Sequence, residues 1–206
     1  LIESHKQISA VIKIHSSKPV SLALNLLDFQ PSGFLGEVAV RLMRYIINGY
    51  IMRRTLDYCD YIGMNYYFHH HLSWFGLRKH SHENHEKTDR GWGIHPEGLE
   101  RVLLSLKKYE KPVYILENGL ADAADSRREK FIKDHLYYLH CAIAKGVDVT
   151  GYLHWSLTDN FEWEEGFWPR FGLIEVDRED LLRRKVRYSA TKYAEICKNN
   201  SFDYEV

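Results

Sequence analysis

The chain has 206 residues, of which 45% are hydrophobic and 14% aromatic, so it is long enough to bury a core as one domain. Its 28 Lys and Arg residues balance its 28 Asp and Glu residues, and the formal net charge is zero. This balance argues against nucleic acid and anionic membranes as partners, because no long-range field attracts them, and it favours a neutral ligand.

No apolar run reaches the roughly 18 residues of a membrane span, and the first residues lack the charge and hydropathy order of a signal peptide. The three cysteines, Cys59, Cys141 and Cys197, are odd in number and share no CxxC spacing. They suit reduced thiols better than a disulfide framework, which predicts a cytoplasmic protein.

The first elements in chain order are a helix, a strand, a helix and a strand. Residues 1–14 have apolar residues at helical spacing but no capping residue before Leu1, so we expect a missing segment upstream. Residues 19–25 then predict a short strand, and residues 36–58 predict one long helix. Residues 59–67 predict the next strand.

The second part of the chain continues the alternation after a loop rich in charged residues and histidines. His95 and Pro96 predict the start of a helix, and residues 113–117 predict a strand. Ser126 and Glu129 have the spacing of a capping box, which opens a helix that ends near residues 145–146. The inward side chains of that helix are expected to be Ile132, Leu136, Leu139 and Ile143. Residues 149–155 predict a fourth strand and residues 189–200 a last helix.

Strict alternation of strands and helices implies parallel strands with right-handed crossovers, in a doubly wound sheet or in part of a β/α barrel. Neither GxGxxG nor GxxxxGK[ST] occurs, which weakens the nucleotide-binding alternative. Polar and aromatic residues follow the apolar part of each strand, where barrels carry their functional groups. These residues are Asn25, Asn65, Tyr66, Tyr67, Glu117, Asn118 and Trp155.

The segment WSLTDNFEWEEGFWPRFG, residues 155–172, alternates aromatic rings with carboxylates and amides. Flat rings stack on the C–H faces of sugars, and carboxylates or amides bond their hydroxyl groups. Trp155, Asp159, Asn160, Glu162, Trp163 and Phe171 therefore indicate a carbohydrate-binding loop, whereas the alternative is that the rings only cap the core.

The motifs ENG, GMNYY, GWGIHPEGL and WSLTDNFEWEEGFWPRFGLIEVD together resemble glycoside hydrolase family 1, the retaining β-glucosidase and β-galactosidase group. The resemblance covers nearly the whole chain, in the order of the family's motifs. It implies that Glu117 is the catalytic nucleophile and forms a covalent glycosyl-enzyme. It also implies that Asn65 and Tyr67 belong to the catalytic site, with Tyr67 bonded to the nucleophile.

The same resemblance implies a pocket for the terminal sugar, with a platform for the departing group at Trp92. Its lining residues are Trp155, Glu162, Trp163 and Phe171. A carboxylate at Glu162 would repel a 6-phosphate, so unphosphorylated β-glucosides or β-galactosides are the expected substrates. No cofactor and no metal is expected.

The sequence departs from the family in two places. Leu116 precedes the nucleophile where the family usually has Thr, and the sequence leaves open whether this lowers activity. The Asn-Glu-Pro motif of the general acid/base is absent, although retaining hydrolysis needs two carboxyls about 5 to 5.5 Å apart. As possible substitutes, Glu97 is expected to be a charge in the first turn of a helix, and Glu164 and Glu165 are expected to lie on the loop surface.

We therefore expect an α/β fold in which residues 1–206 form a single half-barrel domain, strands five to eight of a TIM (β/α)8 barrel. The open edges predict association with a missing N-terminal half or with a second copy. The expected activity is glycoside hydrolysis, weak or absent in this chain alone. The alternatives are a carbohydrate-binding half-barrel without catalysis and a self-associating structural module.

The histidines at positions 69–71, 80, 82 and 85 fit no standard metal-ligand spacing, so we expect a solvated loop there. His154, which precedes Trp155, is expected to pack in the barrel wall.

Overall fold

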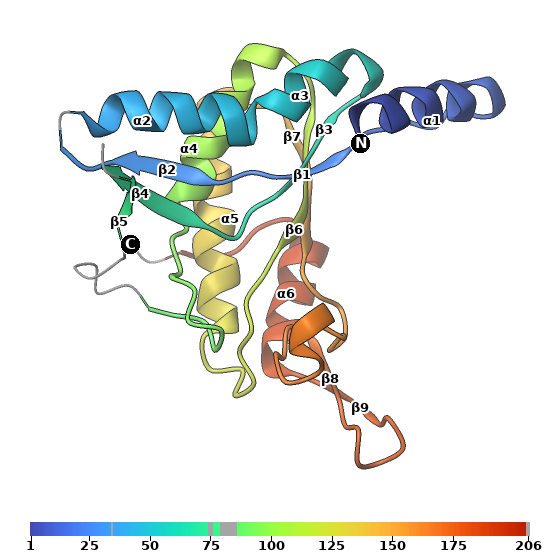
Figure 1. The fold of residues 1–206 in the computed structure, drawn as a ribbon. Helices are drawn as coiled ribbons and strands as arrows, with labels where there is room; N and C mark the ends of the chain where they lie inside the picture. The colour runs from blue at the N-terminus through green and yellow to red at the C-terminus, as the bar shows by residue number, and fades with distance from the viewer. Residues whose placement is uncertain (34, 74–75, 79–85, 205–206) are drawn as a thin grey trace.

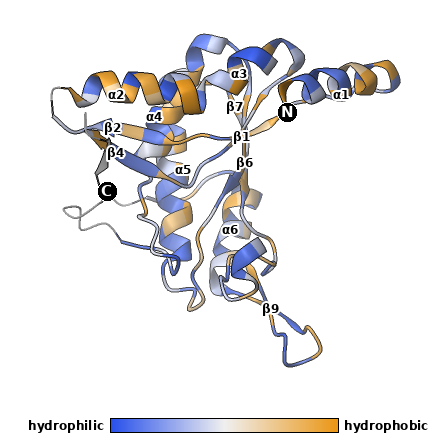
Figure 2. Ribbon diagram, in the orientation of Figure 1, coloured by the Kyte–Doolittle hydropathy of each residue, from blue (hydrophilic) through white to orange (hydrophobic). Residues whose placement is uncertain are grey.

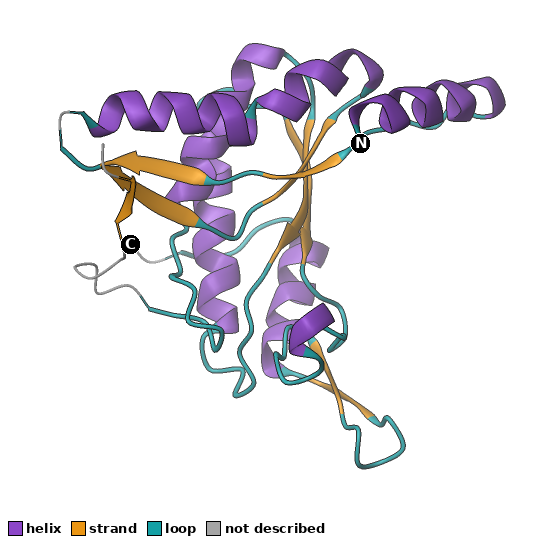
Figure 3. Ribbon diagram, in the orientation of Figure 1, coloured by secondary structure: helices purple, strands orange, loops and turns teal. Residues whose placement is uncertain are grey.

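The computed structural model describes residues 1–33, 35–73, 76–78 and 86–204. Its central feature is a sheet of four parallel strands in the order β1-β3-β6-β7, seen nearly edge-on in Figure 3. The strands are β1 (Ala23–Asn25), β3 (Ile62–Asn65), β6 (Val113–Asn118) and β7 (Val149–His154). All four agree in position with predicted strands, and the parallel pairing confirms the inference drawn from their alternation with helices.

Each of these strands is followed by helical structure, which makes four consecutive β/α units (Figure 1). The segment after β1 comprises α2 (Gly36–Met43), the π-helical turn η1 (Arg44–Asn48), α3 (Tyr50–Thr55) and the 3-10 turn η2 (Leu56–Tyr58). The later units carry α4 (Glu97–Leu106) with the 3-10 turn η3 (Lys107–Tyr109), α5 (Arg128–Ala144) and α6 (Tyr188–Asn199).

The main core lies between the sheet and helices α4 and α5. Met64 of β3 and Ile115 of β6 pack against Leu99 and Leu103 of α4 and against Leu139 of α5. These positions alternate along the strands and recur at helical spacing, so one face of the sheet and one stripe of each helix are removed from water. A second cluster joins α5 to α6, with Leu120, Phe131, Ile132 and Leu173 buried and Tyr193 and Ile196 packed against them.

The other face of the sheet is less covered. The side chain of Leu153 in β7 is 56% exposed. Leu116 and Tyr114 each pack over a glycine of a neighbouring strand, because a Cβ built on Gly63 would lie 2.7 Å from Leu116 Cδ1 and one on Gly151 would lie 2.8 Å from the Tyr114 ring. Leu116 therefore fills a space that glycine leaves on this face.

The chain also contains smaller elements outside the four β/α units. They are β2 (Asp28–Pro31), β4 (His69–Ser73) and β5 (Gly76–Arg78), which form a three-stranded sheet, the hairpin β8 (Ile174–Val176) and β9 (Arg184–Val186), and the 3-10 turn η4 (Trp163–Glu165). The predicted loop after residue 67 is thus wrong in part, because residues 69–73 pair with both β2 and β5.

Helix α1 (Ile2–His15) forms as predicted and projects at one end of the molecule (Figure 1). Its two buried side chains make polar contacts: Ser9 Oγ donates to the Tyr58 carbonyl at 2.9 Å, and the His5 ring lies 3.3 Å from Cys59 Sγ. Apolar side chains of α1 are exposed, including Ile8 and Val11, and Figure 2 shows hydrophobic segments along this helix.

Two helix predictions are corrected. The single helix expected over residues 36–58 is interrupted at η1, where the Asn48 side chain bonds both the Leu27 N–H, at 3.1 Å, and its carbonyl, at 2.7 Å. The Ser126 capping box does not form, because Asp122 Oδ2 accepts the N–H groups of residues 127 and 128 instead. Ile143, expected to face inward, is 41% exposed.

No helix in the described part of the chain is both long enough and apolar enough to cross a membrane.

Candidate functional site

The site is centred on Glu117, near the carboxyl end of β6. Its strand register pairs it with Asn65 at the end of β3, and the Tyr66 N–H donates to the Glu117 carbonyl at 2.9 Å. The side chain of Tyr67, just beyond β3, donates its hydroxyl to Glu117 Oε2 at 2.9 Å. Two adjacent strands thus bring the predicted nucleophile and the predicted tyrosine into direct contact.

Tyr67 is chemically suited to hold this carboxylate. Burial raises the pKa of the Tyr67 phenol above its usual value, and the negative charge and hydrogen bond of Glu117 raise it further. The Tyr67 hydroxyl therefore keeps its proton. It can act as a permanent donor that fixes the direction of one carboxylate oxygen.

The residues after Glu117 hold β6 against both neighbouring strands, β3 and β7. Asn118 is fully buried, donates from Nδ2 to the Tyr66 carbonyl at 2.8 Å and accepts the Tyr152 hydroxyl at 2.8 Å. Gly119 passes so close to the next strand end that a Cβ there would lie 1.7 Å from the Trp155 carbonyl oxygen. The Asn and Gly of the Glu-Asn-Gly motif, Asn118 and Gly119, are therefore required by the local structure.

Asn65 adds an available polar atom to this strand end. Its Oδ1 is buried and has no hydrogen-bond partner in the part of the chain that the structure describes. Buried polar atoms of native proteins are normally satisfied, so an orphaned acceptor at this strand end suits a ligand hydroxyl.

Aromatic rings contact the ring of Tyr67. The Trp92 ring meets the Tyr67 ring edge-on at a centroid distance of 5.9 Å and the Phe68 ring at 4.6 Å. Phe171 lies 6.3 Å from Trp92 and is only 1% exposed. Phe171 therefore supports Trp92 from the protein side, whereas Trp92 itself is half-buried.

Arg90 connects this aromatic group to the loop of residues 155–172. Its guanidinium lies 3.9 Å from the centre of the Trp92 ring, 3.4 Å from Glu162 Oε2 and 2.7 Å from Glu165 Oε1. A continuous set of contacts thus runs from Glu117 through Tyr67, Trp92 and Arg90 to Glu162.

Sequence reasoning missed Arg90 and misjudged Glu165 as a surface charge. The available signal was a cation two positions before Trp92, at the edge of a segment already assigned to the site. Its carboxylate partners lie more than 70 positions later, at separations of 72 and 75 residues, so only the fold shows the pairing.

The predicted sugar loop has a mixed outcome. Glu162 Oε1 accepts from Asn160 Nδ2 at 2.7 Å, and the Trp155 N–H donates to the Asn118 carbonyl at 2.9 Å, which places Trp155 next to β6. Trp163 is 84% exposed, so its ring is accessible but is not packed into the group around Trp92.

Asp159 was expected to be a sugar contact, and this interpretation is wrong. Its buried carboxylate makes a bidentate ion pair with Arg187, at 2.9 and 3.1 Å, and accepts the N–H groups of Gly172 and Val176. Burial alone would raise the pKa of Asp159, but the Arg187 hydrogen bonds and charge and the two backbone donors lower it overall. Asp159 therefore holds the loop in place.

The remaining expectations concern histidines and surface carboxylates. Among the described residues, no group of three His, Cys, Asp or Glu side chains is arranged to hold a metal ion, and His80, His82 and His85 lie outside the described residues. His154 packs between the rings of Phe131 and Tyr193. Glu97 lies in the first turn of α4, as predicted.

Known proteins resemble this chain in sequence and in fold. The sequence profile of Glycosyl hydrolase family 1 matches residues 51–202. A beta-galactosidase of Sulfolobus acidocaldarius is 37% identical over 100% of this chain and 48% of its own length, and a galactolipid galactosyltransferase of Arabidopsis thaliana is 34% identical over 91% and 30%. The crystal structure of a hyperthermophilic beta-glucosidase from Pyrococcus furiosus superposes with a TM-score of 0.89 at 34% identity, covering 98% of this chain and 46% of that one.

The chain thus spans about half, or less, of the length of the relatives that it matches. Because its four β/α units superpose on about half of such barrels, the prediction of one half of a (β/α)8 barrel is confirmed.

Proposed function

The chain belongs to glycosyl hydrolase family 1, and from this membership we propose that it supplies the nucleophile-bearing half of a retaining β-glycosidase. The observation that carries the proposal is the 2.9 Å hydrogen bond from the Tyr67 hydroxyl to Glu117 Oε2 at the carboxyl end of β6. A nucleophilic carboxylate needs to be ionised and oriented, and a neutral phenol donor supports both requirements.

In the proposed reaction, Glu117 attacks the anomeric carbon of a β-glycoside. A bond forms between a carboxylate oxygen and this carbon while the glycosidic C–O bond breaks and its electron pair leaves with the departing oxygen. That oxygen takes a proton from a general acid. The family's Asn-Glu-Pro motif for this group does not occur in the 206 residues, so the acid is proposed to come from a complementary half. Water then hydrolyses the glycosyl-enzyme.

The proposed ligand contacts follow from where the side chains lie. Trp92 offers a half-buried ring beside Tyr67, with Phe171 behind it, and Asn65 offers an unpaired acceptor. We assign the terminal sugar to Trp155 and Glu162, with the exposed ring of Trp163 at its outer side. These roles rest on the family resemblance, and the contacts of Glu162 with Arg90 and Asn160 support its placement there.

The preference for an unphosphorylated sugar is also part of the proposal. Arg90 places one positive charge beside Glu162, but it is shared with Glu165, so two carboxylates face one guanidinium. The excess negative charge disfavours a phosphate dianion at this position. The free cysteines support a reducing, cytoplasmic environment, in which the enzyme would act in carbohydrate metabolism.

A partner is proposed for the less covered face of the sheet. Strands β1 and β7 are the sheet edges, and Leu153 exposes an apolar side chain on β7. We propose that residues 1–206 act as one half-barrel domain, completed by a complementary half-barrel or by a second copy. Light scattering at several concentrations tests self-association, and a constant monomer mass contradicts the second copy.

The test of the nucleophile uses activated 2-fluoro β-glucosides and β-galactosides. Their good leaving group departs without protonation, so a bound covalent sugar accumulates even where the acid is absent. The chain should gain the mass of one fluorosugar, Glu117→Gln should gain none, and the matched control Glu164→Gln should label normally because Glu164 is exposed. An unlabelled wild-type chain would contradict the proposal. One relative is named a galactosyltransferase, and this covalent step precedes hydrolysis and transfer alike.

A further inference from the structure

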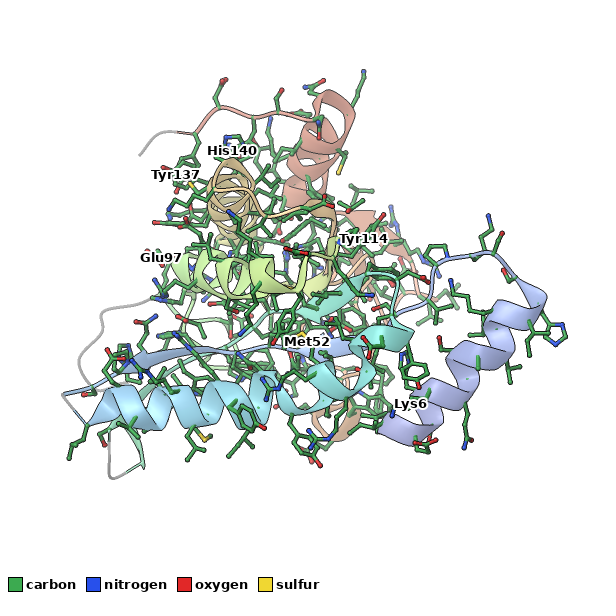
Figure 4. All side chains as sticks on the ribbon, turned by 90° about the horizontal axis from the view of Figure 1, so that it is seen from above. Lys6, Met52, Glu97, Tyr114, Tyr137 and His140 are labelled. Carbon is green, nitrogen blue, oxygen red and sulfur yellow. The ribbon has the colours of Figure 1, made fainter. Side chains whose placement is uncertain are left out.

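A second concave site lies on the outer side of the half-barrel, between the α2–α3 segment and α4. The cavity measures about 450 Å³, and Met52, labelled in Figure 4, lies in its wall between the two helical segments. None of its lining residues belongs to the site around Glu117. Its volume falls within the range of about 300–1,000 Å³ that is typical of small-molecule sites.

The side chains that line this cavity carry mostly positive charge. Its lining contains five cationic side chains and one carboxylate, namely Arg41, Arg44, Arg53, Arg101, Lys108 and Asp28. Asp28 is 2% exposed, and Arg101 donates to its Oδ2 from Nε at 3.1 Å and from Nη2 at 2.7 Å. Among the described lining residues, the one carboxylate is therefore neutralised within the wall, and four positive charges remain.

The walls are fixed by side-chain hydrogen bonds to the backbone. Asn48, at the end of the π-helical turn η1, bonds both polar backbone groups of Leu27. Arg44 Nη2 donates to the Phe29 carbonyl at 2.8 Å, and Arg53 Nη2 donates to the Tyr45 carbonyl at 2.7 Å. A π-helical turn is rare and is often found at functional sites, and here η1 forms part of the cavity wall.

Two cations remain available to a ligand. Among the described residues, the Arg41 side chain has no hydrogen-bond or ion-pair partner, although its carbonyl accepts the Arg44 N–H, and the Lys108 ammonium lies 5.1 Å from the centre of the Tyr109 ring without an ion-pair partner. Tyr45 also lines the cavity, with the Arg53 guanidinium 3.9 Å from its ring centre. One guanidinium group can bind two oxygens of a phosphate at once. Several converging cations favour a multiply charged anion over a single carboxylate.

We propose that this cavity binds a small ligand through its phosphate group or groups, with Arg41 and Lys108 as the principal free donors. The site is independent of the proposed glycosidase chemistry. Its ligand is anionic, in contrast to the neutral sugar assigned to Glu162 and Trp155.

The test is calorimetric titration of the chain with sodium pyrophosphate at low ionic strength. We expect a single saturable site that weakens as salt is added. Arg41→Glu and Lys108→Glu should each raise the dissociation constant by about tenfold or more, which corresponds to about 1.4 kcal/mol. The matched control Arg184→Glu makes the same charge change on the exposed hairpin strand β9 and should leave the constant within about twofold.

Three results would overturn the proposal. They are the absence of saturable heat, equal weakening by Arg184→Glu, and binding to phosphatidic acid vesicles without binding to pyrophosphate. The last result would assign the cations to a lipid surface instead of a small ligand. Since Arg41→Glu leaves Glu117 untouched, normal labelling by the fluorosugar alongside lost pyrophosphate binding separates this site from the proposed active site.

Discussion

Replacing Asp159 with Ala should destabilise the protein strongly, although this residue touches no proposed substrate. The change leaves Arg187 buried without its bidentate partner, and it also removes the acceptor of the Gly172 and Val176 N–H groups. Arg187 and Asp159 have side chains only 5% and 1% exposed. Removing one member of such a buried pair costs about 3–5 kcal/mol, which is a large part of a typical stability of about 5–15 kcal/mol.

Urea unfolding measures this loss. With a slope of about 2–3 kcal/mol per M, the midpoint should fall by about 1–2.5 M. The control Asp180→Ala breaks an ion pair with Arg183 whose side chains are 57% and 78% exposed, and it should change stability by less than about 0.5 kcal/mol. A loss below about 1 kcal/mol for Asp159→Ala would refute the assignment of this residue as the anchor of the loop.

Three further changes test the arrangement around the site. Gly119→Ala should lose at least about 2 kcal/mol in thermal unfolding, because its Cβ would lie 1.7 Å from the Trp155 carbonyl oxygen, and an unchanged midpoint would refute the close approach. Burial lowers the pKa of His154 from 6.5 to about 3. The contribution of neutral His154 to the free energy of unfolding is therefore complete above pH 6.5, and it declines by about 1.4 kcal/mol per pH unit as the pH falls from 6.5 towards 3. His154→Phe should remove that part of the decline, and identical slopes in urea titrations at pH 4 to 6 would contradict it. Arg90→Gln should weaken sugar binding, followed by Trp fluorescence, by about tenfold because Glu162 loses its cationic support, and an unchanged affinity would exclude that role.

The periodicity of apolar residues predicts most of the β/α units, because each strand or helix buries one face and the residues on that face must be apolar. Residues 113–117 and the helix from residue 128 onwards carry patterns that the core between β6 and α5 requires. The break at η1 was not predictable in this way, since it accompanies two hydrogen bonds between Asn48 and Leu27, which lie 21 positions apart. Strand β4 was not predictable for the same reason. It pairs with β2, a distant segment of the chain, and the residue spacing within either segment does not reveal this pairing.

The candidate site was likewise predictable only where local motifs determine it. The contact between Tyr67 and Glu117 could be expected from the resemblance of their motifs, because neighbouring parallel strands end at the same edge. The role of Arg90 and the positive cavity could not, since both depend on which loops and helices meet. A net charge of zero over the whole chain also concealed four unbalanced positive charges in the wall of one cavity.

The central claim, that Glu117 is the nucleophile, is tested most directly by locating the covalent sugar with fragmentation mass spectrometry. The account predicts that the mass increase lies on the Glu117 side chain, within the peptide that contains residues 113–120. A label on Glu162, on Glu164 or on any other carboxylate would contradict it, whatever the overall extent of labelling.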